Sequence, residues 1–370
     1  MIELTKLNDL SLAIKNCIDS DHIMLDSLRN DVRVFKAATR RIHPRSATAI
    51  SLVGTDGGNN KIQYDPFMIQ LIRVVDSSQN EHCLEILTPN TSMDDLNKKH
   101  ISTNGKGRTP LGRMMEYLGV LSLHQLSPVF KIDPEKRSPS WIPVYREMTE
   151  WAVLFSLVRE KDFASDTVIV RDGFLRSKTF SGLLFRKLRE GIENAISQHY
   201  ENSRRRIYVA GIAKRSKVLQ TYRLAMALEG VMRNAYPCYL EVDRKIEEKV
   251  YKWDEFARGD EEATGEPNKF VGGKMFLVKF GEGKRDPTWA VDLLLSQIED
   301  APTIFGYLLS DAIEGFPVPF YPSCLQKAHE NAALVDFDLD ILQDKICSNL
   351  RTKLGDELAL QEIDPSRVRY

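Results

Sequence analysis

The order of apolar runs along the chain limits its fold more strongly than any other feature of the sequence. Three runs typical of strands follow one another closely, at residues 47–53, 66–75 and 82–87. The loops between them contain Gly-Gly-Asn-Asn and Asp-Ser-Ser-Gln-Asn, which are turn compositions. Because strands joined by short loops pair antiparallel, this part of the chain is predicted to form a meander.

A different pattern follows the meander. Helices are expected at about 144–161, 180–199 and 218–232, and single strand-like runs at 167–171 and 207–213 separate them. Helices that alternate with single strands predict parallel strands joined by crossovers. An antiparallel meander followed by parallel strands, flanked by helices, is the order of a ribonuclease H-like sheet, although several other mixed α/β folds share this pattern.

The remaining segments frame this α/β region. Apolar residues recur every three or four positions over residues 4–40, which predicts a helical arm. Residues 89–140 are polar and interrupted by Gly and Pro, with one helix expected near 111–123, and we interpret them as an insertion. Further strand-like runs lie at 274–280 and 288–293, and helices are expected near 303–313 and 341–360. The predicted organisation is an N-terminal helical arm (1–44), an α/β domain (45–335) with the insertion at 89–140, and a C-terminal helical tail (336–370).

Composition excludes several classes of protein. With 42% apolar and 28% charged residues, the 370-residue chain has the balance of a soluble globular protein. It has no run of about 18 apolar residues, so no membrane span is predicted, and its charged N-terminus does not resemble a signal peptide. The five cysteines are widely spaced without a C-x-x-C, which favours a reduced, cytoplasmic protein and no zinc knuckle. Because the net charge is -1, any binding to phosphate must come from local basic patches.

Two apolar runs end in the same dipeptide, Asp-Gly. Asp56 follows residues 51–53 of one run, and Asp172 follows residues 167–170 of another. Carboxylates at the ends of neighbouring buried strands suit a shared divalent metal, because hard cations prefer oxygen ligands and a two-metal nuclease needs an acid that bridges both ions. Asp-Gly is also a common turn dipeptide, and for either pair alone the turn is the commoner interpretation.

Two further residues complete the candidate set of ligands. Glu150 lies at the edge of the apolar stripe of its predicted helix, where it or Glu147 could lean toward Asp172; a solvated glutamate near the helix start is the alternative. His329 lies in another predicted helix and could supply one nitrogen ligand, which favours manganese over magnesium. Most histidines in such helices are ordinary surface or core residues.

Basic residues gather around the predicted strand at 207–213. Lys214 follows its carboxyl end, level with Asp172 at the end of the neighbouring strand, where it could stabilise charge on a scissile phosphate. The arginines at 204–206 lie at the opposite end and are more typical of a solvated edge or a nonspecific phosphate contact.

Taken in order, these residues resemble the NurA nuclease family. The matching elements are a strand ending in Asp-Gly-Gly (56–58), a helix containing Glu150, a strand ending in Asp-Gly-Phe-Leu (172–175), a strand followed by a lysine and a small polar residue (209–216), and Tyr-Pro-x-x-Leu-x-Lys-Ala-His (321–329). The resemblance covers residues 45–335, and its last motif is the most specific one.

This resemblance implies a ribonuclease H-like fold and a manganese-dependent deoxyribonuclease that uses two manganese or magnesium ions. It implies 5′-to-3′ exonuclease action and endonuclease action on single strands. It further implies a homodimer that docks on a hexameric HerA-type DNA translocase and serves DNA-end resection and repair, or antiphage defence. By motif match, the metal ligands would be Asp56, Glu150, Asp172 and His329, and Lys214 would be a further catalytic residue.

The chain departs from the family pattern at two positions. Gly58 and Phe174 each stand where the family usually has a serine. Neither change removes a ligand, but both could alter hydrogen bonds to the carboxylates. The leading hypothesis is therefore two-metal hydrolysis of DNA, and the alternative is a DNA-end clamp or adaptor for a translocase motor, with weak or no cleavage. A ribonuclease H-like resolvase or transposase is disfavoured, because the sequence has no separate basic DNA-binding domain.

Overall fold

The computed structural model describes residues 4–46, 50–64, 67–131, 139–251, 269–333 and 336–354. The chain divides into two compact units. Unit 1 comprises Met1–Thr48, Gly173–Lys178 and Val209–Ser323, and unit 2 comprises Ala49–Asp172, Thr179–Tyr208 and Cys324–Tyr370. The predicted boundaries after residues 44 and 335 stay a prediction, and the end of the predicted tail, beyond residue 354, lies outside the described residues.

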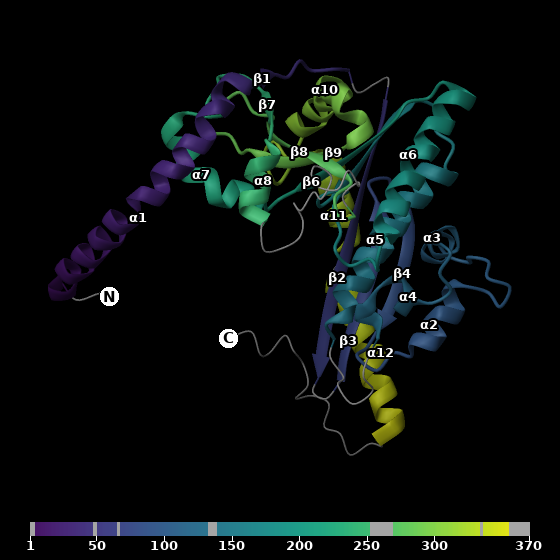
Figure 1. The fold of residues 1–370 in the computed structure, drawn as a ribbon. Helices are drawn as coiled ribbons and strands as arrows, with labels where there is room; N and C mark the ends of the chain where they lie inside the picture. The colour runs from purple at the N-terminus through teal and green to yellow at the C-terminus, as the bar shows by residue number, and fades with distance from the viewer. Residues whose placement is uncertain are drawn as a thin grey trace. The chain divides into compact units, whose positions relative to one another are not determined.

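Unit 2 contains the predicted meander (Figure 1). Strands β2 (Ile50–Tyr64), β3 (Phe67–Asp76) and β4 (Glu81–Leu87) pair antiparallel, and β5 (Asp166–Asp172) pairs parallel to β2 on its other side. The strand order is therefore β5-β2-β3-β4. The chain has the expected mixed α/β fold, with antiparallel and parallel strand pairs flanked by helices, and this arrangement is consistent with a ribonuclease H-like sheet.

Strand β2 is longer than predicted and changes partners along its length. Residues 50–55 pair with β5, whereas residues 55–64 pair with β3. The prediction that this strand ends at Asp56 was therefore wrong. The Gly-Gly-Asn-Asn segment does not turn, because β3 continues to supply backbone hydrogen bonds after β5 has ended.

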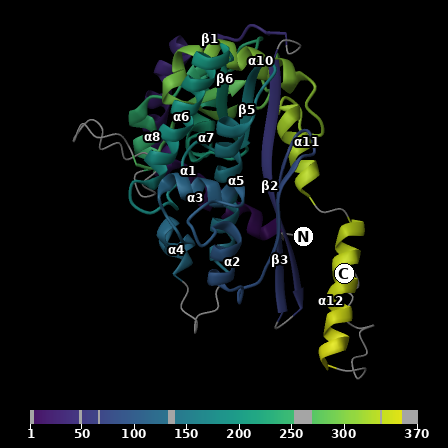
Figure 2. The same ribbon diagram turned by 90° about the vertical axis from the view of Figure 1, so that its right-hand side faces the viewer.

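Helices pack on both faces of β2. Helix α5 (Trp141–Glu160) contacts β2, β3 and β4, and α6 (Leu184–Ser203) packs on α5. Helix α11 (Ser323–Ala332) lies alongside β2 (Figure 2), where the backbone of Cys324 touches Gly54. Helix α12 (Asp336–Leu354) begins the predicted tail.

The predicted insertion is a packed helical layer. Its described residues form α2 (Met93–His100), α3 (Pro110–Leu118), α4 (Leu123–Leu126) and a 3-10 turn, η2 (Pro128–Phe130). Helix α3 ends before the predicted residue 123, because Gly119 adopts a left-handed φ of 77° and caps the helix. Helix α3 packs against α5, and its apolar side chains are buried.

A buried polar network links this layer to α5 and β4. The two ring nitrogens of His100 each lie 2.7 Å from a hydroxyl, Nδ1 from that of Thr109 and Nε2 from that of Tyr145. Tyr145 in turn donates to the carboxylate of Glu85. The tyrosine hydroxyl therefore accepts from Nε2–H, and in a neutral imidazole Nδ1 accepts from the hydroxyl of Thr109. Burial lowers the pKa of His100 to about 4.

Unit 1 holds the other strands among the described residues. Their order is β1 (Arg40–Arg41), β7 (Cys238–Glu241), β8 (Gly273–Lys279), β9 (Trp289–Leu294) and β6 (Ile207–Ala213, of which the first two residues belong to unit 2), and the neighbours pair antiparallel. No pairing was predicted for the run at 288–293, which forms β9 and pairs antiparallel with β6. Strand β7 and helix α8 (Arg244–Tyr251) were not predicted, because both are short.

Helices cover this second group of strands. Helix α1 (Leu4–Ala38) is the predicted arm, and it packs on α7 (Lys217–Glu229) through Val32 and Phe35, which are buried (Figure 1). The η3 turn (Leu295–Asp300) leads into α10 (Ala301–Ile313). None of the described helices combines the length and apolarity needed to cross a membrane.

Candidate metal centre

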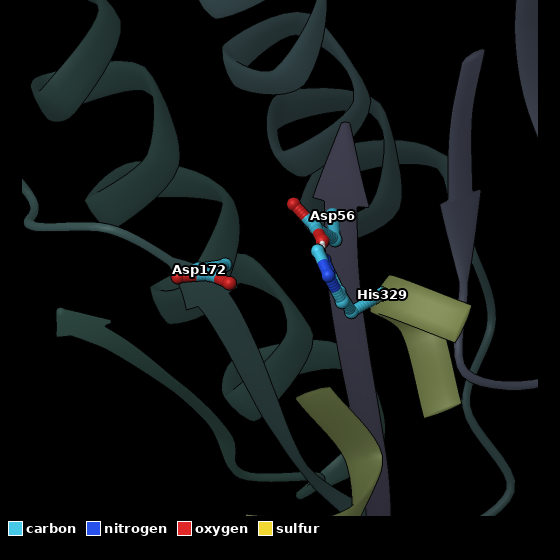
Figure 3. A group of neighbouring side chains, drawn as sticks. All are labelled: Asp56, Asp172 and His329. Carbon is cyan, nitrogen blue, oxygen red and sulfur yellow. Dashed lines mark hydrogen bonds and ion pairs between the residues drawn. The ribbon is translucent and has the colours of Figure 1, made fainter. Parts of the chain in front are cut away.

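Asp56 and Asp172 lie next to each other on adjacent strands, because β2 and β5 pair in parallel register. The last paired residues of the two strands are Thr55 and Arg171, so each aspartate is the next residue along its strand. Figure 3 shows the two carboxylates on these neighbouring strands. Both are partly buried. The structure therefore brings together the two Asp-Gly motifs, as the sequence predicted.

Two glycines seat α11 against the face of β2 that carries Asp56. A Cβ atom at Gly54 would lie 2.4 Å from the carbonyl oxygen of Cys324, and one at Gly58 would lie 2.3 Å from that of Ala332. Side chains alternate along a strand, so positions 54, 56 and 58 share one face. The glycines admit the helix backbone at both of its ends, and Asp56 faces the helix between them.

The close packing of α11 on β2 places His329 next to Asp56. The imidazole Nδ1 lies 2.6 Å from Asp56 Oδ2, and the His329 side chain is 64% exposed (Figure 3). Leu325, Ala328 and Ala332 are buried, as predicted, so the exposed side of α11 carries the histidine. One ligand atom from each of Asp56, Asp172 and His329 lies within 4.8 Å of the others.

Glu150 occupies the opposite face of β2. A Cβ atom at Gly57 would lie 2.4 Å from Glu150 Oε1, which places this carboxylate against the strand next to Asp56 but on the α5 side. Glu150 is 9% exposed and is bound by Arg171 at 2.9 Å and Arg146 at 3.3 Å. Burial raises the pKa of Glu150 to about 7, although both arginines oppose the shift and Asp56 adds to it.

The structure does not place every predicted site residue in one group. Glu150 is outside the three residues whose ligand atoms converge, so its role as a ligand stays a prediction. Glu147 is less buried than Glu150. Lys214 is exposed and belongs to unit 1, where its ammonium lies 5.3 Å from the ring centre of Tyr321, and its catalytic role also stays a prediction.

Both departures from the serine pattern have a packing reason. At position 58 any side chain would meet the backbone of Ala332, so only glycine lets α11 approach. Phe174 is partly buried against the apolar core of unit 1. The guanidinium carbon of Arg176 lies over its ring, 5.6 Å from the ring centre. Neither residue belongs to the three that converge.

The fold is similar to solved structures of NurA nucleases, although no protein-family model and no curated protein matches the chain. The NurA nuclease from Sulfolobus solfataricus has a TM-score of 0.42 and 14% identity, with 97% of this chain and 100% of that chain covered. NurA with manganese has a TM-score of 0.40 and 9% identity, with 91% and 98% covered. Argonaute from Marinitoga piezophila has a TM-score of 0.26 and 12% identity, with 80% and 32% covered.

These two NurA structures cover most of the chain. The likeness is distant in sequence and modest in TM-score. What the candidate site can do follows from this chain's own residues.

The donor set fits a divalent metal ion. Two carboxylates and one imidazole are ligands of the kind that manganese, iron or zinc accepts, whereas an all-oxygen set would favour magnesium or calcium. In the part of the chain that the structure describes, Asp56, Asp172 and His329 are the one group of this kind. The short Asp56–His329 contact fixes the orientation of the imidazole.

Sequence reasoning missed the two arginines that hold Glu150. Arg171 lies between Val170 and Asp172 in a buried strand, and its guanidinium also stacks 4.7 Å from the ring centre of Trp151. A charged residue inside an otherwise apolar strand signals a buried partner of opposite charge. That signal was present in the sequence and points to a nearby acid, which is Glu150.

Proposed function

We propose that this chain is a metal-dependent deoxyribonuclease that hydrolyses phosphodiester bonds at the group formed by Asp56, Asp172 and His329. The convergence of these three side chains, from a strand, a neighbouring strand and a helix far apart in the sequence, carries the proposal. Residues so distant in sequence come together only through the fold. Two acids at adjacent strand ends with one histidine form a donor set suited to metal-assisted hydrolysis.

The chain's own residues have distinct parts in this proposal. Asp56, Asp172 and His329 would hold the ion, which when bound lowers the pKa of water and neutralises charge on a phosphate. Asp56 is the candidate for a bridging ligand, because it contacts His329 directly and lies beside Asp172 at the end of the β2–β5 pairing. Glu150 and Arg171 would position β2 from its other face, since Glu150 packs against Gly57.

The finer assignments are part of the same proposal, and the motif resemblance supports them. We infer manganese as the preferred ion, in a pair, with 5′-to-3′ exonuclease and single-strand endonuclease action. We further infer a homodimer that works with a HerA-type hexameric ATPase in DNA-end processing or phage defence. The histidine in the donor set supports manganese over magnesium.

A cleavage assay tests the proposal directly. Purified protein with manganese should degrade linear DNA, and Asp56→Ala or Asp172→Ala should each abolish degradation. Asp94→Ala is a matched control, because Asp94 is exposed, lies in the first turn of α2 and is not one of the three converging residues. Undiminished cleavage by both site variants would refute the assignment of the site. Substrates blocked at one end would report the polarity.

The adaptor remains the alternative function to the nuclease. It was raised by the two substituted serines, and Gly58 and Phe174 each have a packing role that leaves the three converging residues unchanged. Isothermal titration with manganese separates the two functions. An absence of manganese binding, together with retained binding to a translocase motor, would favour the adaptor.

A further inference from the structure

Unit 1 carries a hollow of about 660 Å³ between one side of α7 and the loop at residues 284–288. We call it the basic pocket, because cationic residues dominate its lining. They are Lys214, Arg215, Arg223, Arg233, Lys284 and Arg285, and Asp286 is the one acid in the lining. A chain with a net charge of -1 therefore concentrates positive charge at this place.

The positive charge of the basic pocket is available to a ligand. Apart from Lys214, its cations are exposed and form no ion pair or hydrogen bond with any described residue. Asp286 offsets only one of the six positive charges, and its carboxylate accepts a hydrogen bond from the backbone N–H of Gly283 at 2.7 Å. Clustered cations without partners repel one another, and a bound polyanion relieves that repulsion.

The segments that carry these cations are held in place from within. Lys279 is fully buried, and its ammonium donates to the carbonyl oxygens of Asn234 and, at 2.9 Å, of Gly283. Asn234 adjoins Arg233, and Gly283 adjoins Lys284, so one buried side chain ties together two cationic walls of the pocket. A site whose charges are positioned before binding loses less entropy when its ligand binds.

The lining indicates which part of a polyanion the pocket recognises. It contains apolar side chains such as Leu219, Met226 and Val231, but no Phe, Tyr or Trp. Sites that hold unpaired bases present aromatic rings for stacking. Exposed arginines and lysines without such rings are suited to phosphates, and the contacts they make are independent of sequence.

We propose that the basic pocket binds the phosphodiester backbone of a DNA strand through its phosphates. The identity of the ligand rests on the proposed nuclease function, because a nuclease must hold the strand that it cleaves. The pocket would give the chain affinity for DNA that does not depend on the metal ligands, all three of which belong to unit 2.

A binding measurement without metal tests this proposal. The affinity of the full-length protein for a fluorescein-labelled single-stranded oligodeoxynucleotide is measured by anisotropy in EDTA, between about 50 and 200 mM salt. The test variant is Arg223→Gln/Lys284→Gln, which removes one cation from α7 and one from the loop at residues 284–288. The matched control is Lys15→Gln/Lys353→Gln, which removes two exposed lysines outside the pocket lining.

The proposal predicts a specific salt dependence. Each phosphate contact on a single strand contributes about 0.7 to the slope of log affinity against log salt. Loss of two contacts should lower the slope by about 1.4 and weaken binding about 25-fold near 0.1 M salt. The control variant should change neither quantity. Unchanged binding by the test variant, or equal weakening by both variants, would overturn the proposal.

Two further outcomes distinguish DNA binding from small-anion binding, and the pocket proposal from the proposed nuclease activity. If the test variant binds the oligonucleotide normally but no longer gains thermal stability from inorganic phosphate, the pocket is a small-anion site and the proposal is wrong. If Asp56→Ala and Asp172→Ala cleave DNA as well as the unmodified protein while the test variant loses binding, the metal-site assignment fails and the pocket proposal stands.

Discussion

Replacing His329 with alanine should separate metal binding from the stability of the fold. The His329 side chain is 64% exposed and contacts the Asp56 carboxylate at 2.6 Å. Exposed pairs of this kind contribute about 0.2–1 kcal/mol to folding. The variant should therefore lower the free energy of unfolding of the metal-free protein by less than about 1 kcal/mol.

The effect of the same substitution on metal binding should be larger. A ligand present at 100 times its dissociation constant stabilises the folded state by about 2.7 kcal/mol. Residues that only orient metal ligands change affinity by about 10–100-fold, so loss of a direct ligand should cost at least about 100-fold. At the same manganese concentration the variant would then gain only about 0.4 kcal/mol.

The assay is urea unfolding with and without manganese, at a concentration set from the dissociation constant of the unmodified protein. His22→Ala is the matched control, because His22 is 62% exposed and pairs with Asp26 at 3.1 Å in α1, outside the three-residue group. Equal stabilisation of the His329→Ala variant and the unmodified protein by manganese would refute the assignment of His329. A similar loss in the His22→Ala control would show that the effect is unspecific.

Four other substitutions report on the surroundings of the site and on the buried network. Gly58→Ser should destabilise the fold by about 1–3 kcal/mol and weaken manganese binding, because its Cβ atom would meet the Ala332 carbonyl oxygen; calorimetry measures both effects. Arg171→Met should cost about 3 kcal/mol by leaving the Glu150 carboxylate buried with a weaker partner, and Glu150→Gln in that background should restore part of the loss in urea unfolding. The pKa of His100 is about 4 in the folded state and near 6.5 in the unfolded state. The contribution of His100 to stability is therefore complete above pH 6.5 and should fall by about 3 kcal/mol as the pH drops toward 4. His100→Gln should remove this component from the pH dependence of unfolding, and an unchanged dependence would contradict the assignment of a neutral imidazole.

The sequence predicted elements better than it predicted their connections in space. The strands at 82–87 and 207–213 and the helix at 144–161 were found within a few residues, because each has a clear periodicity. Strand β7 and helix α8 were missed, because segments of four and eight residues are too short to show a clear periodicity. The antiparallel pairing of β6 with β9 was also missed, because local pattern does not report long-range partners.

The three converging residues were predictable as residue types, but their grouping was not. Asp56 and Asp172 follow apolar runs and His329 follows a specific motif, and each feature is visible in the sequence. The separation of Glu150 from the group depends on the alternation of side chains along β2, which places Asp56 and Gly57 on opposite faces. A strand thought to end at Asp56 gives no reason to expect that separation.

The register of β2 therefore determines the chemistry that this edge of the sheet can perform. Parallel pairing with β5 stops after Thr55, which leaves Asp56 and Asp172 level and without each other's backbone as a partner. Antiparallel pairing with β3 continues, so Asp56 is held in a regular strand and not in a turn. A one-residue shift of β2 would turn Asp56 toward α5 and present a glycine to His329. The two glycines at positions 54 and 58 oppose such a shift, because only they leave room for the backbone of α11.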